Sequence, residues 1–138
     1  MFLDQLNDDQ KRSFLALATR MILADGDVAP EEDGELDRVR DTLGDDVIAS
    51  PEEVFGATNA AVFTDRASRI ITVFEILLLA FSDEHLHADE SAVLAEICGA
   101  LEISDDEHES LAVLAQRLVA NPGDAVVRSE VETIIAAD

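Results

Sequence analysis

The sequence predicts an all-α fold, a single helical bundle of about seven helices around a buried central helix. Three observations lead to this prediction. Apolar residues recur every three or four positions along most of the chain, which is the spacing of one face of an α-helix. No segment alternates apolar and polar residues over more than a few positions, as a half-buried strand would. The chain also contains an internal repeat of helix, acidic loop and helix.

The internal repeat relates two long segments of the chain. A shift of 58 positions places Thr19–Leu43 on Leu77–Leu101 without a gap, pairing acidic residues in the loops and apolar residues in the helices that follow. Each copy contains the end of one helix, a short acidic loop and a second helix. We therefore expect one domain over residues 1–138, with two-fold pseudo-symmetric halves at about 8–60 and 64–138.

The first expected helix follows Asn7 and Gln10, which have the spacing of a capping box. Glycine tolerates the left-handed conformation that closes helices, so this helix is expected to end near Gly26. Its apolar stripe recurs at helical spacing and consists of Phe14, Leu17, Ala18, Met21 and Ile22.

Two further helices are expected before the central one. Pro30 suits the first position of a helix, and the apolar spacing that follows continues until Gly44. Pro51 begins another helix, which extends to about Val62. That helix is weaker, because Gly56 falls inside it.

The second half contains the segment expected to form the buried central helix. Thr64 and Asp65 mark its start, and Ile70–Phe81 is apolar on nearly all sides. This apolar run is too short to span a membrane, which needs about 20 residues. We therefore expect a core helix, in which Glu75 is either a buried functional carboxylate or part of a polar rim.

Three more helices are expected after the second acidic loop. The first has an apolar stripe that includes Cys98, which predicts a buried and unreactive thiol. Ser104, followed by three acidic residues, predicts the start of the next helix. Asn121 and Pro122 are expected to cap the last helix, whose apolar residues are Val126, Val127, Val131, Ile134 and Ile135.

Composition and charge narrow the function. The chain has 31 acidic residues against nine lysines and arginines, a formal net charge of −22 at pH 7. This field repels nucleic acid and anionic lipid surfaces, and it attracts cations and basic protein surfaces. A single cysteine forbids an internal disulfide, and the N-terminus lacks the features of a signal peptide. We therefore expect a cytoplasmic protein that binds no nucleic acid and does not insert into a membrane.

The two acidic loops hold the candidate metal ligands. Each has an aspartate near a helix end and a glutamate seven residues later, one turn into the next helix. Clustered carboxylates are unfavourable unless protons or cations neutralise them, and hard divalent cations prefer oxygen ligands. An imidazole in the second loop shifts the preference there toward transition metals. The candidate ligands are Asp25, Asp27 and Glu32 in the first loop and Asp83, His85 and Glu90 in the second.

The same loops have a simpler interpretation without metal. Aspartate and glycine commonly end helices, and a glutamate in the first turn often caps its own helix. Neither loop fits the spacing of ligands and glycine in a calcium-binding EF-hand loop. Cap-only loops therefore remain an alternative. No catalytic motif accompanies the loops, so we expect no enzyme.

The first loop and the helix after it carry a family pattern. The run Leu23–Glu32, LADGDVAPEE, is followed by apolar residues at helical spacing up to Gly44. This pattern resembles the signature of TerB-like tellurite-resistance proteins, and Ser82–Leu101 resembles the second half of that family. The second copy departs from the family pattern by having Glu84 where glycine is usual.

The resemblance implies an all-helical, pseudo-symmetric domain whose acidic residues are thought to bind metal. Asp25, Glu32, Asp83 and Glu90 match the positions of those acids. The resemblance also implies a role in tellurite and other stress resistance, within cytoplasmic or membrane-proximal protein complexes. A similar module occurs in a J-domain co-chaperone, which favours an adaptor role.

Two functions are therefore expected from the sequence. The first is a stress-response domain that binds a divalent metal ion through its two acidic loops. The alternative is a metal-free acidic module, adaptor-like or co-chaperone-like, that docks basic patches on other proteins. Acidic residues outside the loops, such as Asp105, Asp106 and Glu107, support this alternative equally well.

Overall fold

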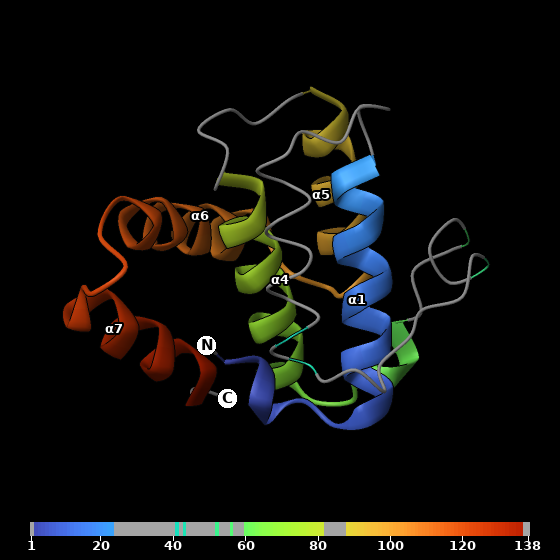
Figure 1. Ribbon diagram of the computed structural model, residues 1–138, viewed down its shortest axis with the longest axis horizontal. Coiled ribbons are helices and arrows are strands. Elements are labelled where there is room, and N and C mark those ends of the chain that lie inside the picture. The colour runs from blue at the N-terminus through green and yellow to red at the C-terminus, as the bar shows by residue number, and fades with distance from the viewer. Residues whose placement is uncertain are drawn as a thin grey trace.

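The structure is a computed structural model that describes residues 2–23, 41, 43, 52, 56, 60–81 and 88–136. Within these residues every regular element is helical and none is a strand, which confirms the all-α prediction. The elements, drawn in Figure 1, are the 3-10 turns η1 (Leu3–Gln5) and η2 (Ala60–Val62) and the helices α1 (Asp8–Leu23), α4 (Arg66–Phe81), α5 (Ala88–Ala100), α6 (Asp105–Ala120) and α7 (Ala125–Ala136).

The number of helices differs from the prediction. The described residues contain five α-helices, fewer than the seven expected. The helices expected at 30–43 and 51–62 lie mostly outside the described residues. Of the single described positions within them, Asp41, Leu43 and Glu52 are helical and Gly56 is a bend. The C-terminal end of the second is the 3-10 turn η2, which the Phe63 N–H closes by donating to the Ala60 carbonyl at 3.1 Å.

Helix α4 lies at the centre of the described part of the fold, as predicted. It contacts η1, α1, α5, α6 and α7, and Figure 1 shows it between α1 and the α6–α7 pair. Every residue from Ile70 to Leu77 is buried, because neighbouring elements cover this helix on all sides. No described helix is long and apolar enough to cross a membrane. Fully buried side chains from the other elements complete the core, among them Phe14, Met21, Phe63, Leu94, Ile97 and Leu111.

The buried carboxylate of Glu75 has a structural partner far away in the sequence. Its Oε1 accepts a hydrogen bond of 2.9 Å from the backbone N–H of Phe2. The Phe2 ring packs edge-on against the ring of Phe74, with centroids 5.9 Å apart and planes at 66°. These two contacts hold the start of the chain against α4, so Glu75 belongs to the core and not to a polar rim.

Local capping interactions set most of the helix starts. Asn7 and Gln10 form the predicted reciprocal pair, at 2.9 and 3.0 Å, before α1. The Asp65 carboxylate accepts the Ser68 N–H at 3.0 Å, and this serine lowers the pKa of Asp65 below its ordinary value. The predicted cap of the last helix was wrong. Asp124 accepts the Val126 and Val127 N–H groups at 3.0 and 3.2 Å, whereas Asn121 ends α6.

The second repeat copy has the predicted helix boundaries. Helix α4 ends at Phe81 and α5 begins at Ala88, on either side of the acidic loop. Cys98 on α5 is buried, as predicted, and this burial, with a smaller effect of Asp105, raises the pKa of its thiol to about 11. Most of the first copy, including 24–40, lies outside the described residues, so the two-fold relation between the halves stays a prediction.

Helix α5 ends at a left-handed residue that is not glycine. Glu102 has a φ of 60°. Its N–H donates to the Gly99 carbonyl at 3.3 Å, and the Ile103 N–H donates to the Cys98 carbonyl at 2.9 Å. This is the hydrogen-bond pattern of a Schellman motif, in which glycine is the usual left-handed residue. A side chain here is unfavourable, because its Cβ crowds the backbone.

Glu102→Gly is expected to raise the free energy of unfolding by about 1 kcal/mol, because glycine removes the left-handed strain at some cost in unfolded-chain entropy. The exposed Glu102–Arg69 ion pair, at 3.3 Å, is lost as well and contributes little. Urea denaturation measures the change. The control Glu102→Ala loses the same ion pair but keeps the strained Cβ. Equal stabilities of the two variants would show that strain at this position is negligible.

Candidate functional site

Side-chain caps stabilise the first turns of the two C-terminal helices. Ser104 and Glu107 form a capping box at the start of α6, with the Glu107 N–H 3.2 Å from the Ser104 hydroxyl and the Ser104 N–H 3.3 Å from the Glu107 carboxylate. Asp124 caps α7. Between the helices, the Asp124 N–H donates to the Asn121 carbonyl at 3.0 Å and closes a tight turn.

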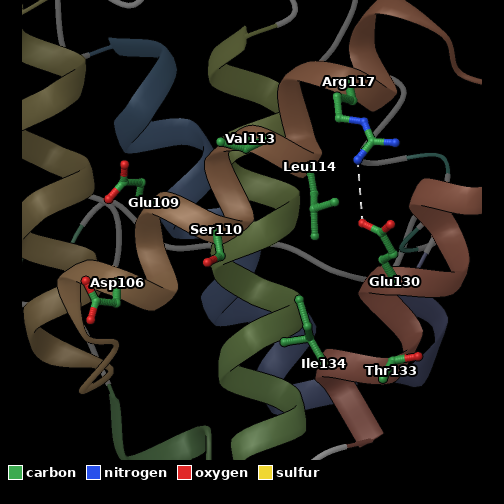
Figure 2. A pocket seen from close by; sticks show the side chains of 9 residues that line it. All are labelled: Asp106, Glu109, Ser110, Val113, Leu114, Arg117, Glu130, Thr133 and Ile134. Carbon is green, nitrogen blue, oxygen red and sulfur yellow. Dashed lines mark ion pairs between the residues drawn. The ribbon is translucent and has the colours of Figure 1, made fainter.

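Both helices bury one face against α4. The buried face of α6 consists of Leu111, Leu114, Ala115 and Leu118, and that of α7 of Val127 and Val131. Because each helix turns only one face to α4, a second face of each remains to border the space between them. That space is a groove of about 770 Å³, shown in Figure 2, lined by Asp106, Glu109, Ser110, Val113, Leu114, Arg117, Glu130, Thr133 and Ile134.

The floor of the groove is apolar. Leu114 is buried and Ile134 is half-buried, so these two side chains connect the groove to the core. Val113 stands beside them with 51% of its surface exposed. Val113 therefore adds exposed apolar surface next to the floor formed by Leu114 and Ile134.

The rim of the groove is mainly acidic. Asp106 and Glu109 lie along α6 and Glu130 lies across the groove on α7, against a single cation, Arg117. The Arg117 guanidinium lies 3.6 Å from the Glu130 carboxylate, and both side chains are 47% exposed. In the described part of the chain no cation pairs with Asp106 or Glu109. The groove therefore offers uncompensated negative charge beside an apolar floor.

A smaller hollow of about 230 Å³ continues the groove past Asp106 and Ser110. Arg66, at the start of α4, forms an ion pair there with Glu107. This guanidinium, helped by hydrogen bonds from Ser104, lowers the pKa of the Glu107 carboxyl below its ordinary value. Glu107 is therefore charged at neutral pH and pairs with Arg66, which leaves the acids of the main groove without this cation.

The metal ligands predicted from the sequence lie elsewhere in the chain. The structure describes none of the side chains concerned, and Glu90 is placed only as the third residue of α5. Among the residues that are described, no group of three or more histidines, cysteines or carboxylates is close enough to hold a metal ion. The two-loop metal site therefore stays a prediction. The residues concerned are Asp25, Asp27, Glu32, Asp83, His85 and Glu90.

Reasoning from the sequence missed the groove between α6 and α7. In the sequence, Asp105, Asp106 and Glu107 indicate a helix start and surface charge. Nothing in their spacing relates α6 to α7. One signal was present, because Val113 lies on α6 outside the stripe formed by Leu111, Leu114 and Leu118. An apolar residue beside the core stripe widens the apolar face beyond what one packing partner covers.

The polar groups that line the groove are carboxylates, hydroxyls and one guanidinium. Comparison of the whole chain with protein-family models, with curated proteins and with solved structures finds no match.

Proposed function

We propose that this chain is a non-enzymatic, acidic protein-interaction domain that acts as an adaptor for basic partners. The observation that carries the proposal is the groove between α6 and α7, with its apolar floor and its three rim carboxylates against one guanidinium. Apolar contact supplies affinity and the polar rim supplies orientation, as in other protein interfaces.

The charge of the whole chain supports the same partner class. A net charge of −22 accelerates encounters with basic protein surfaces and slows encounters with polyanions. The partner we propose is therefore a protein with a basic surface, and not a nucleic acid or an anionic membrane. The resemblance to TerB-like proteins adds the proposal that such partners belong to stress-resistance complexes in the cytoplasm.

The immobilised protein is expected to capture basic partners from a cell extract at low salt, because attraction between exposed charges is strongest there. Raising sodium chloride from about 0.1 M to about 1 M should release them, since the Debye length falls from about 10 to about 3 Å. Chelator should release none of them. Mass spectrometry identifies the released proteins, and their sequences give the excess of lysine and arginine over acidic residues.

Two results would contradict this proposal. One is the capture of proteins with no excess of lysine and arginine over a mock resin. The other is release by chelator at constant ionic strength, which would favour a metal-dependent partner instead.

A second candidate function is the binding of a divalent metal ion by the two acidic loops, in a TerB-like stress-response domain. The gapless repeat supports it, because Asp25 and Glu32 recur 58 positions later as Asp83 and Glu90. The boundaries of α4 and α5 support it too, since they put Glu90 in the first turn of α5, where the repeat expects it. Isothermal titration calorimetry of chelator-treated protein with divalent ions tests it.

A further inference from the structure

We infer that the occupant of the α6–α7 groove is a basic amphipathic helix, and that Arg117 is an internal substitute for one of its cations. This inference rests on the proposed adaptor function and names the class of segment that the groove binds. It is carried by four features of the groove, which are its shape, its floor, its acidic rim and its ion pair.

The shape of the groove fits a helix. The α6 residues that line it recur at helical spacing from Asp106 to Arg117, which corresponds to a stripe of roughly 16 Å along the helix axis. The described residues offer no strand to which an extended segment could add, so an extended chain would leave its backbone groups without partners in the groove. A helix satisfies its own backbone hydrogen bonds and presents only side chains.

The floor of the groove requires apolar residues on one face of that helix. Val113 and Leu114 come from α6 and Ile134 from α7, and Figure 2 shows the Leu114 and Ile134 side chains facing one another, with Val113 apart from Ile134. A helix lying over them would place apolar side chains at positions i, i+3 or i+4, and i+7, as helices bound in grooves do. Val113 is the most exposed of the three and gains most from being covered.

The rim of the groove selects for positive charge on the same helix. Asp106 and Glu109 form no ion pair with a cation in the described part of the chain, although Arg66, which pairs with Glu107, lines the same hollow as Asp106. A second copy of this protein is a poor occupant, because it would add a net charge of −22 to the same surface. Lysines and arginines that flank the apolar face of a partner helix complement the rim instead.

Arg117 occupies the position beside Glu130 that a cation of the partner would take. Its ion pair with Glu130 bridges the two helices at 3.6 Å, and both groups are about half exposed, so the pair is weak and opens readily. When a basic helix enters, one of its cations takes over Glu130 and Arg117 turns toward solvent. Arg117 therefore competes with the partner, and it also repels the partner's charge.

The test uses a fluorescent peptide of about 14 residues, roughly 21 Å long as a helix, with leucines on one face and lysines and arginines beside them. Fluorescence anisotropy measures its binding to the full chain. One control peptide has the same composition in scrambled order. The other has glutamates in place of the basic residues. We expect binding of the first peptide only.

Variants of the protein test the groove directly. Glu109→Gln/Glu130→Gln is expected to weaken binding about fivefold, which is the combined effect of two rim charges. Val113→Ser should weaken it by a similar factor of about five, because the floor loses an apolar contact. Arg117→Gln should instead tighten binding about threefold, since it removes the competitor for Glu130. Glu132→Gln, which removes one negative charge on α7 outside the groove, is the control and should leave binding close to wild type.

Several results would overturn the inference. If Glu109→Gln/Glu130→Gln binds no more weakly than Glu132→Gln, the groove is not the site, although the capture of basic partners would still support the adaptor function. Equal binding of the scrambled peptide would show that charge alone is recognised and that no helix is selected. Weaker binding by Arg117→Gln would make Arg117 a contact of the partner and not its competitor. If no basic peptide or protein binds at all, the adaptor function fails as well.

Discussion

Phe74→Ala is expected to lower the free energy of unfolding by about 3–5 kcal/mol, the usual effect of removing a fully buried ring. Phe74 is 0% exposed and lies in the middle of α4, the helix that contacts every other described helix. The cavity left behind cannot collapse easily, because α4 is surrounded by packed elements. The variant also loses the edge-to-face contact with Phe2, which holds the start of the chain.

Urea denaturation followed by circular dichroism measures this loss. The free energy of unfolding of a domain of this size is about 5–15 kcal/mol, so the variant is expected to lose a large fraction of its stability. Phe81→Ala is the matched control, because Phe81 is the last residue of the same helix and is only half-buried. If both variants lose the same free energy, the full burial of Phe74 does not determine the size of the loss.

Divalent metal is expected to stabilise the protein through its first acidic loop. The sequence predicts that Asp25, Asp27 and Glu32 bring carboxylates together, and the net charge of −22 raises the local concentration of cations. An ion that binds only the folded chain stabilises it by about 2.7 kcal/mol at a hundredfold excess over its dissociation constant. Isothermal titration calorimetry of chelator-treated protein with calcium, magnesium, manganese and zinc measures the binding.

Matched variants separate the two loops. Asp25→Asn/Glu32→Gln should abolish the stronger site, and Asp83→Asn/Glu90→Gln should abolish only the weaker one, where His85 favours softer ions. If none of the four ions gives a heat of binding, or if the first double variant titrates like the wild type, the loops only cap their helices. The metal function would then be abandoned and the adaptor function retained.

Much of the fold could be predicted from the sequence because the deciding interactions are local. The pairs Asn7–Gln10 and Ser104–Glu107 are three residues apart, so their caps form wherever the chain begins a helix. The length and all-round apolarity of Ile70–Phe81 were enough to predict a buried central helix, since such a helix is stable only when others cover it.

Two helix ends differ from the prediction for reasons that lie close to them in the chain. Asn121 and Asp124 are both residue types that cap helices well. Asp124 caps the start of α7, because Asn121 is the C-cap of α6. Glu102 could not be identified as a helix end, because its left-handed conformation is one that glycine normally adopts. The Schellman hydrogen bonds, and not the residue type, impose that conformation.

The sequence by itself determined the helical class, most helix starts, the burial of α4 and Cys98, and the negative charge of the surface. Tertiary structure alone decided that Glu75 meets the Phe2 N–H across 73 positions of sequence, and that α6 and α7 border a groove. The groove depends on the angle at which two helices pack on a third, and this angle follows from the whole core. The spacing of apolar residues in the sequence shows which face of a helix is apolar. It does not show which neighbouring helices cover that face, or which part of it stays exposed.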